Sequence, residues 1–230
     1  MRLMLILALF FVRPAWSHED HLLVCGHGFA LLVQRVRGPL TAVVGEPRLL
    51  IGNDTYQINS ELGEGQSKVY LANGPGGKTR VVKIYPGSSN SQGIAAFEYW
   101  ASKYLQEKGI PTAGALTKPT ALHQPAIGKE GEFAVVKEYV EGLRWYEIQS
   151  LKRESKISEQ RYRQIKESLD DITARANRTF DDGAFTTWLQ RQGETAASTG
   201  IPRYLLGEPD LGSSNNFIFT RDRGWVIIDP

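Results

Sequence analysis

The stretch LGEGQSKVYLANGPGGKTRVVKIY, residues 62–85, decides the fold of this chain. It has two strand-like apolar runs joined by the turn sequence GPGGKT, so it predicts an antiparallel hairpin. Gly63 and Gly65 stand at a turn, where the backbone can approach a polyphosphate and point N–H groups at its oxygens. Lys83 alternates with valine and isoleucine in the last strand. Two interpretations remain open: a phosphate site, or an ordinary turn beside a lysine on the solvated side of an edge strand.

The sequence around this hairpin predicts a β-rich first half. The run LLIGNDTYQINSEL, residues 49–62, precedes it, so three antiparallel strands are expected first. A helix should follow, because Ile94, Phe97, Ala101, Tyr104 and Leu105 recur at helical spacing before Gly109 and Pro111 end it. Residues 132–142, EFAVVKEYVEG, form the clearest member of a further strand pair.

The second half is predicted to be mostly helical. Ser158 can cap a long helix with one apolar stripe, and residues 184–192, AFTTWLQRQ, predict a short one. The end of the chain predicts a hairpin, with strands NNFIF (215–219) and WVIID (225–229) and the turn RDRG. The expected class is therefore α+β.

Carboxylates at three places could join Lys83 in one site. Glu98 borders the inward face of its helix and could pair with Lys83, although a lone glutamate on a helix is usually solvated. Asp210 precedes the late hairpin, which should return Asp229, at the end of its second strand, near Asn216. Carboxylate and amide oxygens suit Mg²⁺, which binds through one or two carboxylates plus substrate phosphates.

Taken in order, the glycine loop, Lys83, Glu98, Asp210, Asn216 and Asp229 resemble the motifs of the protein kinase-like superfamily. The resemblance covers residues 49–230. It implies a two-lobed fold with a β-rich N-lobe (about 49–137), a hinge at KEYVEG (about 138–142), and a reduced, mostly helical C-lobe (143–230). It also implies ATP and Mg²⁺ as cofactors, and Mg-ATP as the donor of a γ-phosphoryl group to a hydroxyl.

The resemblance assigns roles to single residues. Lys83 would hold the α- and β-phosphates, oriented by Glu98, and Asp210 would accept or orient the hydroxyl proton. The nucleotide would also contact Leu62, Gly63, Gly65 and Val69 of the glycine loop and the backbone at Glu138 and Val140 of the hinge. The metal ligands would be Asp229 and Asn216, with Asn215 as the alternative, because the spacing from Asp210 favours Asn215 and the spacing to Asp229 favours Asn216.

The sequence departs from the family pattern at several points. The glycine loop lacks its third glycine, the catalytic-loop tripeptide is Glu208-Pro209-Asp210, and Lys137 stands before the hinge. No glycine follows Asp229, and the chain stops at Pro230, as in a truncated product. Small kinases that pathogenic bacteria secrete as effectors are similarly reduced. That similarity favours a Ser/Thr residue of a protein, such as a host protein, as the acceptor.

Two other functions remain open. A small-molecule kinase of the aminoglycoside or choline type would need an acidic acceptor pocket, for which Asp170, Asp171, Asp181 and Asp182 are the clustered candidates. A pseudokinase would bind partners without turnover. The resemblance to the effector kinases makes a protein kinase the first choice among the three, and the clustered acids are more typical of a solvated helix face and turn.

The composition and the N-terminal residues indicate where the protein is located and which partners it can have. The net charge of +2 gives no argument for nucleic-acid binding, and the single Cys25 excludes an internal disulfide or a multi-cysteine metal site. Arg2, the apolar run 3–12 and small residues near Ser17 are typical of a secretory signal, too short for a membrane span. We expect a secreted monomer, or a cytoplasmic one if residues 1–48 come from a mis-assigned start.

Overall fold

A curved antiparallel sheet forms the first half of the chain. The computed structural model describes residues 47–230 except 124–126, 128, 181–182, 207–210 and 212. Within them, six strands pair in the order β1-β2-β3-β4-β6-β5, all antiparallel. Their bounds are β1 Arg48–Ile51, β2 Asp54–Glu64, β3 Lys68–Asn73, β4 Thr79–Tyr85, β5 Thr120–Ala121 and β6 Phe133–Glu138.

The prediction of three opening strands is wrong, because the first run divides in two. Gly52 adopts φ 62°, a left-handed conformation that glycine takes without strain, and the chain reverses there. β1 and β2 then pair as a hairpin, with Ile51 opposite Asp54. The sheet therefore opens with four antiparallel strands, and the hairpin predicted from residues 62–85 forms β3 and β4, joined through a short 3-10 turn at Pro75–Gly77.

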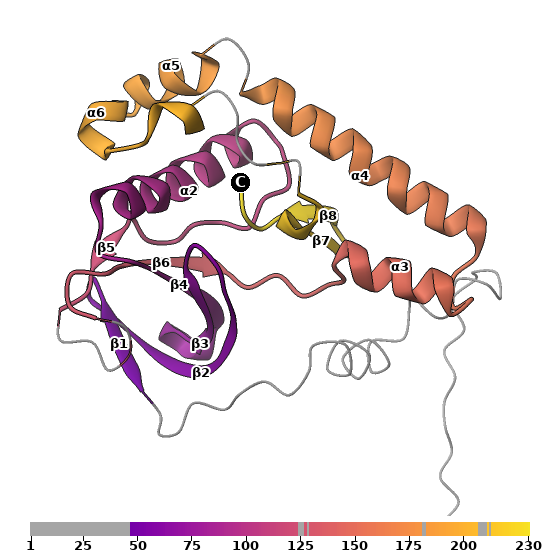
Figure 1. The fold of residues 1–230 in the computed structure, drawn as a ribbon, viewed down its shortest axis with the longest axis horizontal. Helices are drawn as coiled ribbons and strands as arrows, with labels where there is room; N and C mark the ends of the chain where they lie inside the picture. Colours follow the sequence, from indigo (N-terminus) through magenta and orange to yellow (C-terminus); the bar gives the residue numbers. More distant parts are fainter. Residues whose placement is uncertain (1–46, 124–126, 128, 181–182, 207–210, 212) are drawn as a thin grey trace, which may run out of the picture.

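Helix α2, Ser89–Glu107, links the sheet to the rest of the molecule. Ser88 caps it by accepting a hydrogen bond from the Ser91 N–H, and Gly109 (φ 72°) follows its end. The five apolar residues that predicted this helix all lie on it. Figure 1 shows α2 between the sheet and the helices α5 and α6, and α2 contacts β4, β6 and α5.

The second half consists of helices and one hairpin. The predicted cap is present, since Ser158 Oγ accepts from the Arg161 N–H at the start of α4. The helix α3 was not predicted. The elements are α3 Trp145–Arg153, α4 Glu159–Thr179, α5 Ala184–Arg191, α6 Ala196–Thr199, the 3-10 turns η4 Arg203–Leu205 and η5 Ser214–Asn216, and the strands β7 Phe217–Thr220 and β8 Gly224–Ile227.

One apolar core joins the two halves. The side chains of α2 pack with those of α4, α5 and the β7–β8 hairpin, while a second cluster lies within the sheet. The predicted α+β class, with a β-rich first half and a mostly helical second half, is confirmed. Among the residues described, no helix has both the length and the apolar character that a membrane crossing needs. Most of the predicted signal-like segment, residues 1–46, lies outside the described residues.

Candidate functional site

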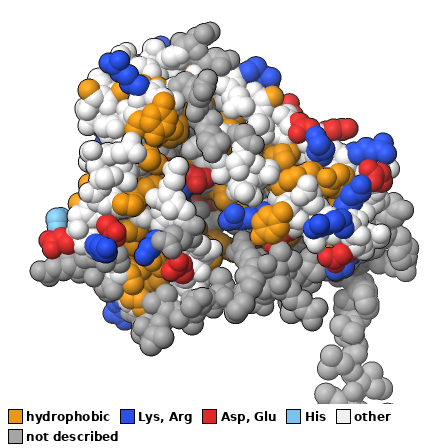
Figure 2. Space-filling model, viewed as in Figure 1, with side chains coloured by type: hydrophobic (Ala, Val, Ile, Leu, Met, Phe, Trp, Pro, Cys, Tyr) orange, Lys and Arg blue, Asp and Glu red, His pale blue; other side chains and the backbone are white. Residues whose placement is uncertain are grey.

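The main cavity lies where the sheet, α2 and the β7–β8 hairpin face one another. Its volume is about 880 Å³, within the range of pockets that hold cofactor-sized ligands. Figure 2 shows this face of the molecule hollowed at its centre, with acidic and basic side chains close together in the hollow. The predicted site residues that line it are Leu62, Gly63, Gly65, Val69, Lys83, Glu98, Glu138, Val140, Asn215, Asn216 and Asp229.

Lys83 lines this cavity and contacts two carboxylates. Its Nζ is 2.7 Å from Glu98 Oε2 and 3.0 Å from Asp229 Oδ2. The three side chains come from β4, from α2 and from the segment after β8. Glu98 is 2% exposed, so the glutamate predicted on the helix face is buried rather than solvated. Lys83 therefore ties the sheet to both α2 and the hairpin.

Electrostatics favour the charged forms of Lys83 and Asp229. Burial opposes the charged form of Lys83, but Glu98 and Asp229 outweigh burial and raise the pKa of Lys83 above its usual value. Burial likewise opposes ionisation of Asp229, yet Lys83 and then Lys137 lower the pKa of that carboxyl. The side chain of Asp229 is 47% exposed in the cavity, which leaves its carboxylate open to a ligand.

The late hairpin brings Asn216 and Asp229 to the same end. Phe217 pairs with Ile227, and the Ile228 N–H donates to the Asn216 carbonyl at 2.8 Å. Asp229 lies two residues past β8, which ends at Ile227, and not at the end of the strand as predicted.

The oxygen ligands at this end fit Mg²⁺. A carboxylate and an amide oxygen are hard donors, and Mg²⁺ in nucleotide sites takes few protein ligands and keeps waters and phosphate oxygens. The described residues hold no group of three or more His, Cys, Asp or Glu side chains, so their acidic groups offer no all-protein cage. Asn215 and Asn216 both line the cavity, so both alternatives for the amide ligand stay open.

The glycine loop borders the cavity from the sheet. Gly63 belongs to β2 and pairs with Val69 of β3, after an irregularity in the register. A Cβ added at Gly63 or Gly65 would meet no atom within 4 Å, so the backbone there faces open space. That space is what a ligand held by main-chain N–H groups would need.

The predicted hinge connects β6 to α3 and contacts the hairpin. Gly142 is required there, because a Cβ would lie 2.3 Å from the Phe219 carbonyl oxygen. Next to it, Leu143 and Phe219 exchange two backbone hydrogen bonds, of 2.9 and 2.7 Å. Val140 is buried against Ile218, which places the hinge backbone along one wall of the cavity.

Lys137, which the sequence places directly before the hinge, makes contacts in the site that the sequence did not predict. It is 2% exposed, and its Nζ is 2.6 Å from Glu98 Oε1. A lysine in the apolar run FAVVKE was the available signal, because a charged residue inside a buried strand needs a partner. Asp210, the predicted catalytic aspartate, lies outside the described residues.

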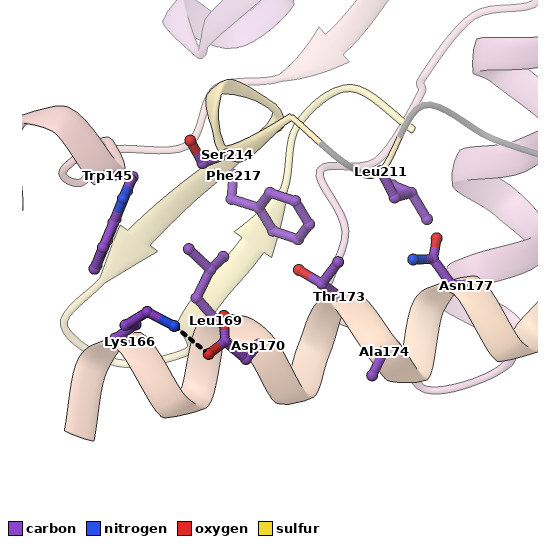
Figure 3. A pocket seen from close by; sticks show the side chains of 10 residues that line it. All are labelled: Trp145, Lys166, Leu169, Asp170, Thr173, Ala174, Asn177, Leu211, Ser214 and Phe217. Atoms are coloured by element: carbon purple, nitrogen blue, oxygen red, sulfur yellow. Dashed lines mark hydrogen bonds and ion pairs between the residues drawn. The ribbon is translucent and has the colours of Figure 1, made fainter. Parts of the chain in front are cut away.

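A second hollow of about 430 Å³ lies between α4 and the hairpin (Figure 3). Asp170, a candidate for an acidic acceptor pocket, lines it but is paired with Lys166 at 2.6 Å. Asp171 is 65% exposed and lies 3.8 Å from Arg175 on the same helix. Asp181 and Asp182 lie outside the described residues. The two described acids therefore belong to a solvated helix face with compensating cations.

Comparisons with known proteins give one kind of match. No protein-family profile matches the sequence, and no curated protein matches it. Among solved structures, the chain is similar to the PknI kinase domain of Mycobacterium tuberculosis: the TM-score is 0.41 at 14% identity, over 82% of this chain and 62% of that one. A cysteine-to-alanine mutant of that domain gives a TM-score of 0.39 at the same identity and coverage. The chain thus spans about three fifths of the length of these kinase domains.

Proposed function

We propose that this chain is a kinase-like phosphotransferase that binds Mg-ATP in the main cavity and moves its γ-phosphoryl group to a hydroxyl. The observation that carries the proposal is the position of Lys83, which contacts Glu98 of α2 and Asp229 of the hairpin inside one cavity. A buried ammonium at the meeting point of three elements is suited to polyphosphate, whose charge it can neutralise.

Each wall of the cavity would have its own task. Glycine-loop N–H groups would face the phosphates, and the hinge backbone at Glu138 and Val140 would hold the base. Lys83, kept in place by Glu98, would neutralise the α- and β-phosphates. Asp229 and Asn216 would hold Mg²⁺, which supplies charge neutralisation at the phosphate oxygens. Such chemistry depends mostly on positioning and electrostatics, so a small set of residues suffices.

The transfer step would need one acceptor hydroxyl and would release ADP. The acceptor oxygen forms a bond to the γ-phosphorus as the bond from that phosphorus to the β,γ-bridging oxygen breaks, and ADP leaves. Asp210 takes or orients the proton of the hydroxyl. We propose a Ser or Thr residue of a protein as acceptor, since Asp170 and Asp171 are paired with cations on an exposed helix face and give no support to an aminoglycoside-type pocket.

Substitution of the central lysine tests the proposal. Lys83→Ala should lower Mg-dependent ATP turnover by about 10²–10³-fold, because it removes a preorganised charge from the reacting phosphates. Lys78→Ala, in the exposed turn between β3 and β4, is the matched control and should keep parental turnover. Thermal unfolding of both variants, together with Lys83→Arg, separates loss of chemistry from loss of fold.

Transfer of labelled phosphate identifies the acceptor class. Label from γ-labelled ATP should enter protein when a mixture of host-cell proteins is added, and it should not enter aminoglycosides or choline. Label in the small molecules would support the alternative kinase class. A parent chain that binds Mg-ATP and transfers no label to either acceptor would be a pseudokinase, and the enzyme proposal would fail.

A further inference from the structure

Lys137 is a buried cation that the proposed transfer step does not use. It lies in β6 next to the predicted hinge and lines the main cavity. With 2% of its surface exposed, its ammonium has lost almost all contact with water, which is costly unless partners replace that contact. The structure supplies those partners, and they belong to two different elements.

The ammonium of Lys137 joins α2 and the end of the hairpin to the sheet. Its Nζ donates to Glu98 Oε1 at 2.6 Å and to the Ile228 carbonyl at 2.5 Å. Ile228 directly precedes Asp229, so the second contact holds the backbone that presents the proposed metal ligand. The base of the side chain is fixed too, because Lys137 pairs with Val81 on one side and with Ala115 on the other.

The two lysines share Glu98 without competing for the same oxygen. Lys83 pairs with Val135 across β4 and β6, and Val81 pairs with Lys137, so both lysines project from one face of the sheet. Lys83 and the Tyr85 hydroxyl contact Glu98 Oε2, while Lys137 contacts Oε1. Two carboxylates and two ammoniums balance within the cluster.

We propose that Lys137 is a positioning residue that anchors Glu98 and the backbone beside Asp229, so that Lys83 stays available to phosphate. This inference rests on the proposed function. When Lys83 engages phosphate, Glu98 keeps the second ammonium and is not left buried with an uncompensated charge.

Nucleotide affinity of Lys137 variants tests the inference. Lys137→Met keeps the apolar stem and removes the donor, and it should weaken Mg-ATP binding about 10-fold or more, as loss of a group that orients a metal ligand does. Adenosine, which has no phosphate, should bind the variant as it binds the parent. A variant that weakens both ligands equally, or neither, would overturn the inference. Lys78→Met is the matched control.

Hydrogen exchange on the nucleotide-free protein tests the anchor separately. In Lys137→Met, the amides of Ile227 and Ile228 and those of α2 around Glu98 should exchange faster than in the parent, and Lys137→Gln, which keeps an uncharged donor, should be intermediate. Lys137→Gln also serves if the Met variant does not fold. If the parent bound neither ATP nor adenosine, the proposed function would be wrong, and so would the inference that Lys137 keeps Lys83 available to phosphate. If the Lys137→Met variant exchanged at the same rates as the parent, the proposal that Lys137 is an anchor would be wrong.

Discussion

Each carboxylate oxygen of Glu98 accepts from at least one donor, unlike a glutamate on a solvated helix face. Oε2 accepts from Lys83 and from the Tyr85 hydroxyl, and Oε1 accepts from Lys137. A carboxylate that is 2% exposed needs such partners, because water cannot reach it. Its charge in turn is needed by the two lysines, so the three charged residues depend on one another.

Removing that charge should destabilise the fold. Glu98→Gln keeps the shape of the side chain but leaves two buried ammoniums facing an amide, and we expect a loss of about 3–5 kcal/mol in the free energy of unfolding. Urea denaturation measures it. The control variant Glu154→Gln, which breaks an exposed pair with Lys156, should have the same free energy of unfolding as the parent. A Glu98→Gln variant as stable as the parent would show that the cluster contributes no net stability.

The sequence predicted part of this cluster. Helical spacing placed Glu98 on the inward border of α2, and the turn RDRG placed Asp229 near Asn216. The contacts of Lys137 could not be predicted, since they depend on the register between β4 and β6, whose pairing partners are distant in sequence. In a hairpin the turn fixes the register, but β4 and β6 are separated by α2 and β5, so no turn fixes which of their residues stand opposite each other.

Helix α2 is held along its length by the second half of the chain. Near its start, Gly93 lies against the Gly200 carbonyl, and near its end Glu107 Oε2 accepts from the Trp188 indole N–H at 2.7 Å. Between them, the Tyr104 hydroxyl donates to the Thr179 carbonyl at 2.7 Å. These contacts fix the helix that carries Glu98.

A methyl group at Gly93 should loosen this contact. In Gly93→Ala, the Cβ would lie 2.1 Å from the Gly200 carbonyl oxygen, which is backbone and cannot swing aside. We expect a net loss of about 1–3 kcal/mol, because overpacking outweighs the gain from replacing a helical glycine. Chemical denaturation measures it, with the exposed neighbour substitution Gln92→Ala as control. A Gly93→Ala protein more stable than the parent would contradict this close packing.

At the scale of elements, the strongest periodic patterns gave correct predictions and the weak ones did not. The long helices α2 and α4 followed from apolar spacing and a serine cap, and β7–β8 followed from its turn. Helix α3 was missed because its nine residues are mostly polar, and its first turn is stabilised by Glu147, whose carboxylate accepts from the Arg144 N–H at 2.6 Å. The shorter α5 was predicted, because Phe185, Trp188 and Leu189 mark one apolar side.

The whole molecule has connections that cross between its two halves at several points. The segment after α2 pairs with β8, where Ala113 donates to the Ile227 carbonyl at 2.7 Å and Ile227 donates to the Pro111 carbonyl at 3.0 Å. The hinge pairs with β7 through Leu143. The apolar core around α2 includes residues of α4, α5 and the hairpin. The site residues are thus held by packing that both halves supply.

The two halves should therefore unfold as one unit. Three aromatic rings of α2 contact rings from the second half: Phe97 and Trp100 contact rings of α5, and Tyr104 contacts Phe180 at the end of α4. A fragment of residues 47–143 would expose these α2 rings to water. We expect that fragment to show no cooperative transition, and the full chain to show one, with equal calorimetric and van't Hoff enthalpies. Calorimetry of both polypeptides measures this. Two resolved transitions, or a cooperatively folded fragment, would mean that the sheet with α2 is independent, and that Lys83 and Glu98 can be positioned without the hairpin that presents Asp229.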